Sequence, residues 1–240
     1  MCGRYTLTRQ DGVIEDLQAS LDPVAARSEW WKPRFNVAPT QPAPVVTLHD
    51  GARTIELMRW GLVPFWAGHD GKQAPLMINA RVETLNNKAV FRDALARRRC
   101  LVPADGFFEW LRVDPRKPMP IYIHPGGQRG KIIAFAGLWA KTTTDAGVEQ
   151  LSFTIVTGPP AELVKPIHDR MPIVLPEASY AAWLDPAVDG DAARALLTVP
   201  TLEDWIAEPV STRVNKAQHD DPSCIEPAHP EAPAQRSLFE

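Results

Sequence analysis

The sequence predicts an α+β protein with a strand-rich, largely antiparallel β core and helices at its periphery. Short runs of β-branched and aromatic residues recur between residues 45 and 157, and turn signals such as Asp50-Gly51 separate them. Helical periodicity is confined to a few short windows. We find no internal repeat and no clear linker, so we expect a single domain over residues 1–216.

The first half of the chain is expected to contain two helices and a hairpin. Apolar residues recur at helical spacing over residues 10–21, which predicts a first helix. Strands at 45–48 and 55–60 flank the Asp-Gly pair, a strong hairpin signal. Residues 76–80 have the apolar character of a buried strand, and residues 88–98 have the pattern of an amphipathic helix.

The second half continues the strand-rich pattern and then becomes helical. A Pro-Gly-Gly turn at 125–127 and a loop at 142–147 separate neighbouring strands. A helix that starts at a proline is expected over 176–184, and another over 190–197. The strands of this half are predicted at 101–102, 106–111, 120–124, 132–139 and 151–157.

The C-terminal tail, residues 217–240, is predicted to be disordered because it is rich in proline, acid and alanine and lacks hydrophobic periodicity. Five acidic residues and one arginine lie in this tail, whereas the whole chain carries a net charge of −3. The net charge of residues 1–216 is therefore close to zero. This allows a local basic groove for nucleic acid, because binding depends on how charge is distributed.

Composition excludes several classes of protein. The chain is 45% hydrophobic but has no run of about 18 apolar residues and no signal-peptide pattern, so we expect a cytoplasmic protein without membrane contact. Its three cysteines lack CxxC spacing and its six histidines lack an HExxH pair. No phosphate-binding glycine motif is present either, so we expect no metal and no cofactor.

Cys2 directly follows the initiator methionine. Removal of Met1 would leave an α-amine and a thiol on one residue, and this pair can condense with an aldehyde, first to an imine and then to a thiazolidine ring. The ordinary pKa of such an amine, about 7.7 to 8.0, leaves roughly a tenth to a sixth of it unprotonated at pH 7. The thiol, at about 8.5, needs help from a base. Alternatively, Cys2 packs as a small apolar residue at the start of a strand.

Asn79 ends the apolar run 76–78, where a buried amide would need hydrogen-bond partners. Such an amide could orient a nucleophile or stabilise a developing oxyanion. It could equally cap the turn that follows.

Glu109 and His168 are candidates for moving protons. Glu109 lies between Phe108 and Trp110, and an apolar pocket there would raise its pKa towards neutrality. His168 precedes Asp169 and Arg170 in a loop, where charges can tune its titration. The alternatives are an exposed strand glutamate and an ordinary surface cluster.

Residues 59–66 combine one arginine with three aromatic residues, and this combination is typical of proteins that stack bases and bind phosphates of single strands. Arg4, Arg34 and Arg81 could add to such a surface. Alternatively, Trp60 belongs to the core, as most tryptophans do. The run Arg97–Arg99 ends a helix, so we interpret it as a solvated face that complements the helix dipole.

Six motifs occur in one order over about residues 2–215, and together they resemble the SRAP family, the SOS-response-associated peptidases whose members shield abasic sites in single-stranded DNA. The motifs are Met1–Arg4, Asn36–Pro39, Trp60–Pro64, Asn79–Thr84, Gly106–Trp110 and His168–Pro172.

The resemblance implies a set of roles. Cys2, exposed by autocatalytic removal of Met1, would form a thiazolidine with the ring-opened abasic deoxyribose. Asn79 would position the amine and the sugar, and Glu109 would handle protons during Met1 release and during crosslink formation or reversal. His168 would assist ring opening and later steps at the imine. The enzyme class implied is an SRAP-type peptidase with crosslinking and lyase activity.

The resemblance also implies the partner, which is single-stranded DNA that contains abasic sites. Arg4, Pro39 and Arg81 would line the DNA groove, with Trp60, Phe65 and Trp66 near a base wedge. A tryptophan pair of some members is replaced here by Phe65-Trp66. We expect a monomer that associates with the bacterial nucleoid when it is bound to DNA.

A second hypothesis is that the protein acts like class II glutamine amidotransferases. These enzymes also begin Met-Cys-Gly and use the N-terminal cysteine to hydrolyse an amide. Their glutamine-binding arginine motif and Asn-Gly segment are not recognisable here. A third reading is a passive single-strand binding module with an unreactive Cys2.

Overall fold

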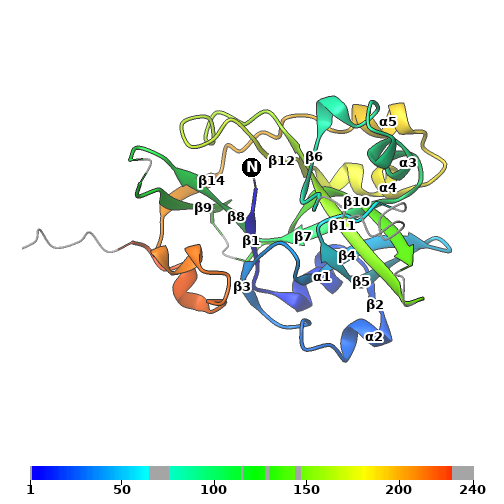
Figure 1. Ribbon diagram of the computed structural model, residues 1–240, viewed down its shortest axis with the longest axis horizontal. Coiled ribbons are helices and arrows are strands. Elements are labelled where there is room, and N and C mark those ends of the chain that lie inside the picture. Colours follow the sequence, from blue (N-terminus) through cyan, green and yellow to red (C-terminus); the bar gives the residue numbers. More distant parts are fainter. Residues whose placement is uncertain (1, 65–75, 115, 128–129, 144–146, 229–240) are drawn as a thin grey trace, which may run out of the picture.

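The computed structural model describes residues 2–64, 76–114, 116–127, 130–143 and 147–228. Two β-sheets make up its body, and short helices lie around them (Figure 1). Most strand pairs are antiparallel, and parallel pairing is limited to β2–β5, β5–β11 and β6–β11 among the described strands. This confirms the predicted strand-rich α+β class.

The larger sheet closes on itself. Its strand order is β12-β11-β10-β7-β4-β5-β2. Strands β11 and β5, which stand near opposite ends of this order, also pair with each other, and this pairing closes the sheet into a small barrel. Closure removes exposed strand edges, which otherwise invite pairing with other chains. The strands of this path are β2 (Ser20–Leu21), β4 (Pro42–His49), β5 (Ala52–Trp60), β7 (Arg99–Ala104), β10 (Ile133–Thr143), β11 (Glu149–Gly158) and β12 (Met171–Pro172). Two short strands attach to it, β6 (Asn79–Arg81) on β11 and β13 (Val174–Leu175) on β10.

The smaller sheet has the order β14-β9-β8-β1-β3 and is antiparallel throughout. Its strands are β1 (Arg4–Leu7), β3 (Arg34–Val37), β8 (Gly106–Leu111), β9 (Met119–Pro125) and β14 (Trp205–Pro209). Strand β1 lies in the interior of this sheet, between β8 and β3. The start of the chain is therefore held by two neighbours, and Figure 1 places it in the middle of the molecule.

The helices are short and lie outside the sheets. The α-helices are α1 (Gln10–Asp16), α2 (Pro23–Ala26), α3 (Ala89–Arg97), α4 (Tyr180–Leu184) and α5 (Gly190–Ala195). Single 3-10 turns are η2 (Val82–Thr84), η3 (Glu177–Ser179), η4 (Thr212–Asn215) and η5 (Pro222–Cys224). None of the described helices has the length and apolarity that crossing a membrane requires.

Most expected elements are present, and the differences have local causes. The hairpin of β4 and β5 turns through Asp50 and Gly51, both at positive φ, which the Asp-Gly pair tolerates. The helix expected over 10–21 ends at Asp16, because residues 20–21 pair with β5 as β2. The strand expected over 76–80 is reduced to β6, which begins at Asn79.

A cluster of fully buried aromatic side chains lies between the sheets. Tyr5 of β1 meets Trp60 of β5 and Phe135 of β10 at centroid distances of 5.3 and 6.1 Å, both edge to face. Trp60 in turn stacks on Phe153. Edge-to-face pairs of this kind add to the free energy that burial alone contributes. The strand that carries the N-terminus is thus packed directly onto the barrel.

Arg99 corrects our interpretation of the Arg97–Arg99 run as a solvated face. Its side chain is only 4% exposed, and its guanidinium donates hydrogen bonds to backbone carbonyls at the ends of α3 and α4. A planar group with five donors suits this task, because the last carbonyls of a helix lack partners within the helix. Arg97 is exposed.

The predicted tail boundary at residue 217 also needs correction, because residues 217–228 pack against the body. Asp220 forms an ion pair with the fully buried Arg34 and accepts the backbone amides of Phe35 and Asn36 at 2.6 and 2.9 Å. The Asn36 carboxamide donates to the carbonyls of residues 214, 216 and 219. The acid content that suggested disorder thus includes the counter-ion of a buried arginine. Residues 229–240 lie outside the described residues.

We predict that Asp220→Ala lowers the free energy of unfolding by about 3 to 5 kcal/mol, because it leaves the Arg34 guanidinium buried without a counter-ion. Urea denaturation measures this change. Glu162→Ala is the matched control, since its ion pair with Lys165 is exposed and should contribute less than about 1 kcal/mol. Equal effects of the two substitutions would contradict the role of Asp220.

Candidate active site

Cys2 lies just before β1 and is completely buried. Its thiol points towards the carbonyl of Arg4, with Sγ and O 3.7 Å apart. Burial, and next the negative charge of Glu109, raise the pKa of the thiol far above its ordinary value. The thiol is therefore neutral here and would need a base before it could react.

Asn79 links the barrel to the reactive end of the chain. Its Nδ2 donates to the Cys2 carbonyl at 2.8 Å. The backbone just before it is fixed by two donors to the Ile78 carbonyl, the Trp60 indole at 2.9 Å and the Ile155 amide at 3.2 Å. Asn79 Oδ1 is buried and has no hydrogen-bond partner among the described residues. A buried acceptor of this kind requires a donor, and an amine at Cys2 could supply one.

Glu109 reaches the site from β8 of the smaller sheet and is 2% exposed. Burial raises the pKa of its carboxyl to about 7, although the positive charge at the N-terminus of the chain acts in the opposite direction. The carboxyl can thus both accept and release a proton near neutral pH. Of the two positions that the sequence left open for Glu109, an exposed strand face and an apolar pocket, the structure has the pocket.

His168 lies in the loop before β12, and its side chain is 25% exposed. Burial, followed by the positive charge of the N-terminus, lowers its pKa. Nδ1 accepts the Arg170 backbone amide at 3.0 Å, and it also lies 2.9 Å from the Asp169 carboxylate. The first contact requires an unprotonated Nδ1 and the second a protonated one. The lowered pKa favours the neutral ring, and the hydrogen bond donated by the Arg170 amide to Nδ1 assigns the proton of that neutral ring to Nε2.

Three of the candidate DNA-binding residues lie at the surface, one is buried, and two lie outside the residues that the structure describes. Arg81 is exposed at the end of β6, while Arg4 and Pro39 are partly exposed. Trp60 has no exposed surface, so we withdraw it as a base-stacking residue and assign it to the core. Phe65 and Trp66 lie outside the described residues.

Two arginines outside the four candidate catalytic residues act near this site. Arg170 pairs with Glu83 of η2 and so joins the His168 loop to the segment that follows Asn79. Arg112, just after β8, acts electrostatically on both Glu109 and His168. The motif His-Asp-Arg pointed to the first residue. No pattern pointed to the second, because it depends on how β8 meets the loop before β12.

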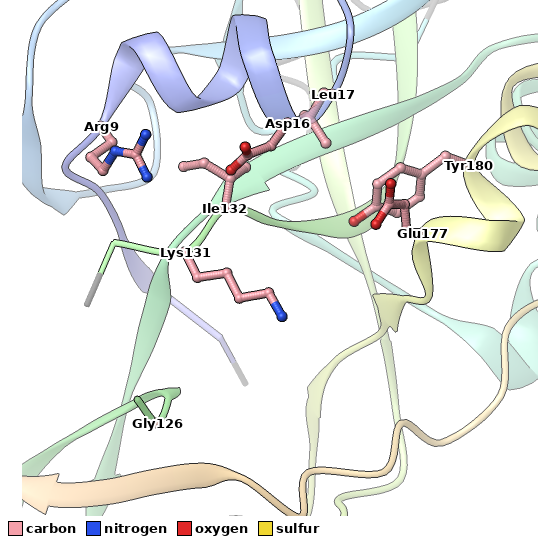
Figure 2. Close-up of a pocket in the computed structure, with 8 residues that line it drawn as sticks. All are labelled: Arg9, Asp16, Leu17, Gly126, Lys131, Ile132, Glu177 and Tyr180. Carbon is pink, nitrogen blue, oxygen red and sulfur yellow. The ribbon is translucent and has the colours of Figure 1, made fainter. Parts of the chain in front are cut away.

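One hollow of the described surface lies away from the four candidate catalytic residues. A cavity of about 610 Å³ is lined by two cations, Arg9 and Lys131, two acids, Asp16 and Glu177, and Tyr180, and Glu177 lies beside Tyr180 (Figure 2). None of the four candidate catalytic residues lines it. No three His, Cys, Asp or Glu side chains in the described part of the chain come together as a metal site. The candidate site is defined instead by buried groups at the start of the chain.

A family model of SOS response associated peptidase (SRAP) proteins matches residues 1–217. The chain belongs to the SRAP family. This confirms the family that the six sequence motifs indicated.

Two relatives illustrate how widely SRAP proteins are distributed. Abasic site processing protein YoqW of Bacillus subtilis is 40% identical over 229 residues, which cover 94% of this chain and 99% of the relative. Abasic site processing protein HMCES of Gallus gallus is 30% identical, with 95% and 78% covered.

Solved structures agree with the fold of this SRAP chain. A crystal structure of a Bacteroides thetaiotaomicron protein superposes with a TM-score of 0.84, covering 95% of this chain and 100% of that chain at 24% identity. A phage-related protein of Bordetella bronchiseptica gives a TM-score of 0.68 at 28% identity, with 87% and 94% covered.

The raised pKa of Glu109 predicts a pH-dependent stability. Between about pH 4.5 and 7 the unfolded chain has released the Glu109 proton while the folded chain retains it, so the free energy of unfolding falls as pH rises through this window. The loss is about 3 kcal/mol and is complete above pH 7. Glu109→Gln removes this dependence, and urea denaturation at pH 4.5 and pH 8 measures it. Parallel pH profiles of the two proteins would contradict the raised pKa.

Proposed function

We propose that this chain is an abasic-site sensor that binds single-stranded DNA and forms a covalent thiazolidine crosslink through Cys2 after Met1 is removed. The crosslink protects the lesion during the response to DNA damage. The names of YoqW and HMCES, both abasic site processing proteins, support this function.

The observation that carries the proposal is the environment of Cys2. Its carbonyl is held by Asn79, whose other amide atom lacks a described partner, and a carboxyl with a pKa of about 7 lies within electrostatic reach. An amine and a thiol on one residue, a fixed amide and a group that transfers protons are the components that condensation with an aldehyde requires.

Release of Met1 comes first, because the Cys2 nitrogen is otherwise part of a peptide bond and cannot form an imine. Hydrolysis of this bond consumes one water molecule and gives free methionine and the α-amine of Cys2. Glu109 would accept a proton from the attacking group and return it to the departing amine. This is the peptidase activity of the chain, directed at its own terminus.

Condensation follows. The Cys2 amine adds to the aldehyde of the ring-opened abasic sugar, and loss of one water gives the imine. The thiol then adds to the imine carbon, and its proton goes to the nitrogen, which closes the thiazolidine ring. His168, neutral and carrying its proton on Nε2, would assist opening of the sugar ring. Glu109 in its protonated form would protonate the departing hydroxyl. The same steps in reverse add one water and return the aldehyde and the free amine and thiol of Cys2, which is reversal of the crosslink.

DNA would be held by residues around this centre. Arg81 is exposed at the end of β6, two residues after Asn79, and Arg4 begins β1, two residues after Cys2, so each follows one partner of the Asn79–Cys2 hydrogen bond. Guanidinium groups bind phosphates through paired hydrogen bonds, so these two residues would fix the backbone of the strand next to the lesion. Pro39 would contribute an apolar surface beside them.

We predict that the processed protein forms a heat-stable adduct with single-stranded DNA that contains one abasic site, and that Cys2→Ala abolishes it. Denaturing gel electrophoresis after heating detects the adduct. Cys100→Ala is the matched control, because Cys100 is also a buried free cysteine but lies in β7.

Two outcomes would contradict the proposal. Release of glutamate from glutamine without adduct formation would favour the amidotransferase reading. Tight DNA binding that survives Cys2→Ala, with no adduct in either protein, would favour a passive binding module.

We also predict that Glu109→Gln slows the loss of Met1, because glutamine cannot transfer the proton. Intact-mass measurement of freshly purified protein reports the fraction that retains Met1. Glu177→Gln, a change on the distant turn η3, should leave processing unchanged. Normal processing in Glu109→Gln would remove Glu109 from this role.

A further inference from the structure

Arg112 follows the last residue of β8 and stands three residues after Glu109 in the same segment. It is exposed, so its guanidinium is available to a ligand. Arg81, by contrast, lies on β6, which belongs to the larger sheet. The two arginines therefore approach the candidate site from different sheets.

Arg112 has no ion pair with any described residue, unlike several other arginines of this chain. Arg170 pairs with Glu83, Arg98 with Asp93 and Arg213 with Asp221. Arg81 shares the property of having no described ion pair. An exposed guanidinium without a carboxylate partner keeps its donors free for a phosphate.

Arg112 is also close enough to act on the two proton-transfer groups of the site. Its positive charge lowers the pKa of both Glu109 and His168, while Asp169 raises both and the N-terminus lowers both. His168 also accepts the backbone amide of Arg170 and lies 2.9 Å from the Asp169 carboxylate. The place of Arg112 in the chain agrees with this effect, because Arg112 directly follows β8, the strand that carries Glu109.

We propose that Arg112 is a second backbone anchor, which binds a DNA phosphate on the β8 side of the reacting nucleotide while Arg81 serves the β6 side. This inference rests on the proposed function, because it assumes that single-stranded DNA occupies the site. Anchors on both sides of one nucleotide would fix the sugar between Cys2 and Glu109.

The position of Arg112 links DNA binding to proton transfer. A phosphate bound to the guanidinium offsets its charge, so the pKa values of Glu109 and His168 rise when the strand binds. Glu109 then favours its protonated form, which is the form that can protonate a departing hydroxyl. Occupation of the anchor would thus prepare the acid for the dehydration step.

The test uses the full chain and an undamaged single-stranded oligonucleotide, which cannot form the adduct. Arg112→Ala should weaken binding about three- to tenfold at 0.1 M salt and reduce the slope of log affinity against log salt by about 0.7, the value for one phosphate contact on a single strand. Arg92→Ala is the matched control, because Arg92 is an exposed arginine of α3 without a described ion pair. It should leave both quantities unchanged.

A second measurement separates an electrostatic role from a structural one. The His168 ring is titrated by NMR in the free protein, where loss of the Arg112 charge should move its apparent pKa upward. In the parent protein, addition of the oligonucleotide should produce a shift in the same direction, and in Arg112→Ala that shift should be smaller.

The outcomes distinguish this inference from the proposed function. If Arg112→Ala and Arg92→Ala bind alike with equal salt slopes while the parent chain forms the adduct, Arg112 is not an anchor and the proposed function stands. If the parent chain forms no adduct with abasic DNA, the proposed function fails whatever Arg112 does.

Discussion

The hydrogen bond from the Asn79 carboxamide to the Cys2 carbonyl joins the two sheets at the reactive end of the chain. It exists only if β6 is in register with β11, and if β1 is held between β8 and β3. The fully buried Tyr5 and Trp60 keep those two parts in contact. The fold therefore builds the site by fixing a chain terminus, which in most proteins is among the least ordered segments.

Burial also sets the chemistry of the site. The same exclusion of water raises the pKa of Glu109 and lowers that of His168, so near neutral pH one group can hold a proton and the other remains uncharged. Groups whose pKa values are displaced in this way cluster at functional sites. The high pKa of the Cys2 thiol fits the proposed order of events, in which the amine reacts first and the thiol adds to an imine already formed.

Local patterns predicted the parts of the fold that depend on neighbouring residues. The hairpin at Asp50-Gly51 and helix α3 follow from a turn preference and an amphipathic period, and both are present. Contacts between segments that are distant in the sequence could not be predicted in this way, because no local pattern indicates them. We assigned Asp220 to an acidic tail because its partner Arg34 lies 186 residues away in the sequence. We interpreted Arg99 as solvated because the carbonyl groups that it binds belong to two different helices. Cys2, Asn79, Glu109 and His168 were found through motifs, whereas the proximity of Arg112 to Glu109 and His168 required the folded chain.

The central claim is that the amine and the thiol of Cys2 are both consumed by one aldehyde. Counting free thiols in the denatured, purified adduct tests it most directly, because the chain has three cysteines and no described disulfide. A thiazolidine at Cys2 leaves two titratable thiols in the adduct, compared with three in the processed protein before reaction. Three thiols in the adduct would mean that the link is an imine through the amine alone, and would contradict the thiazolidine.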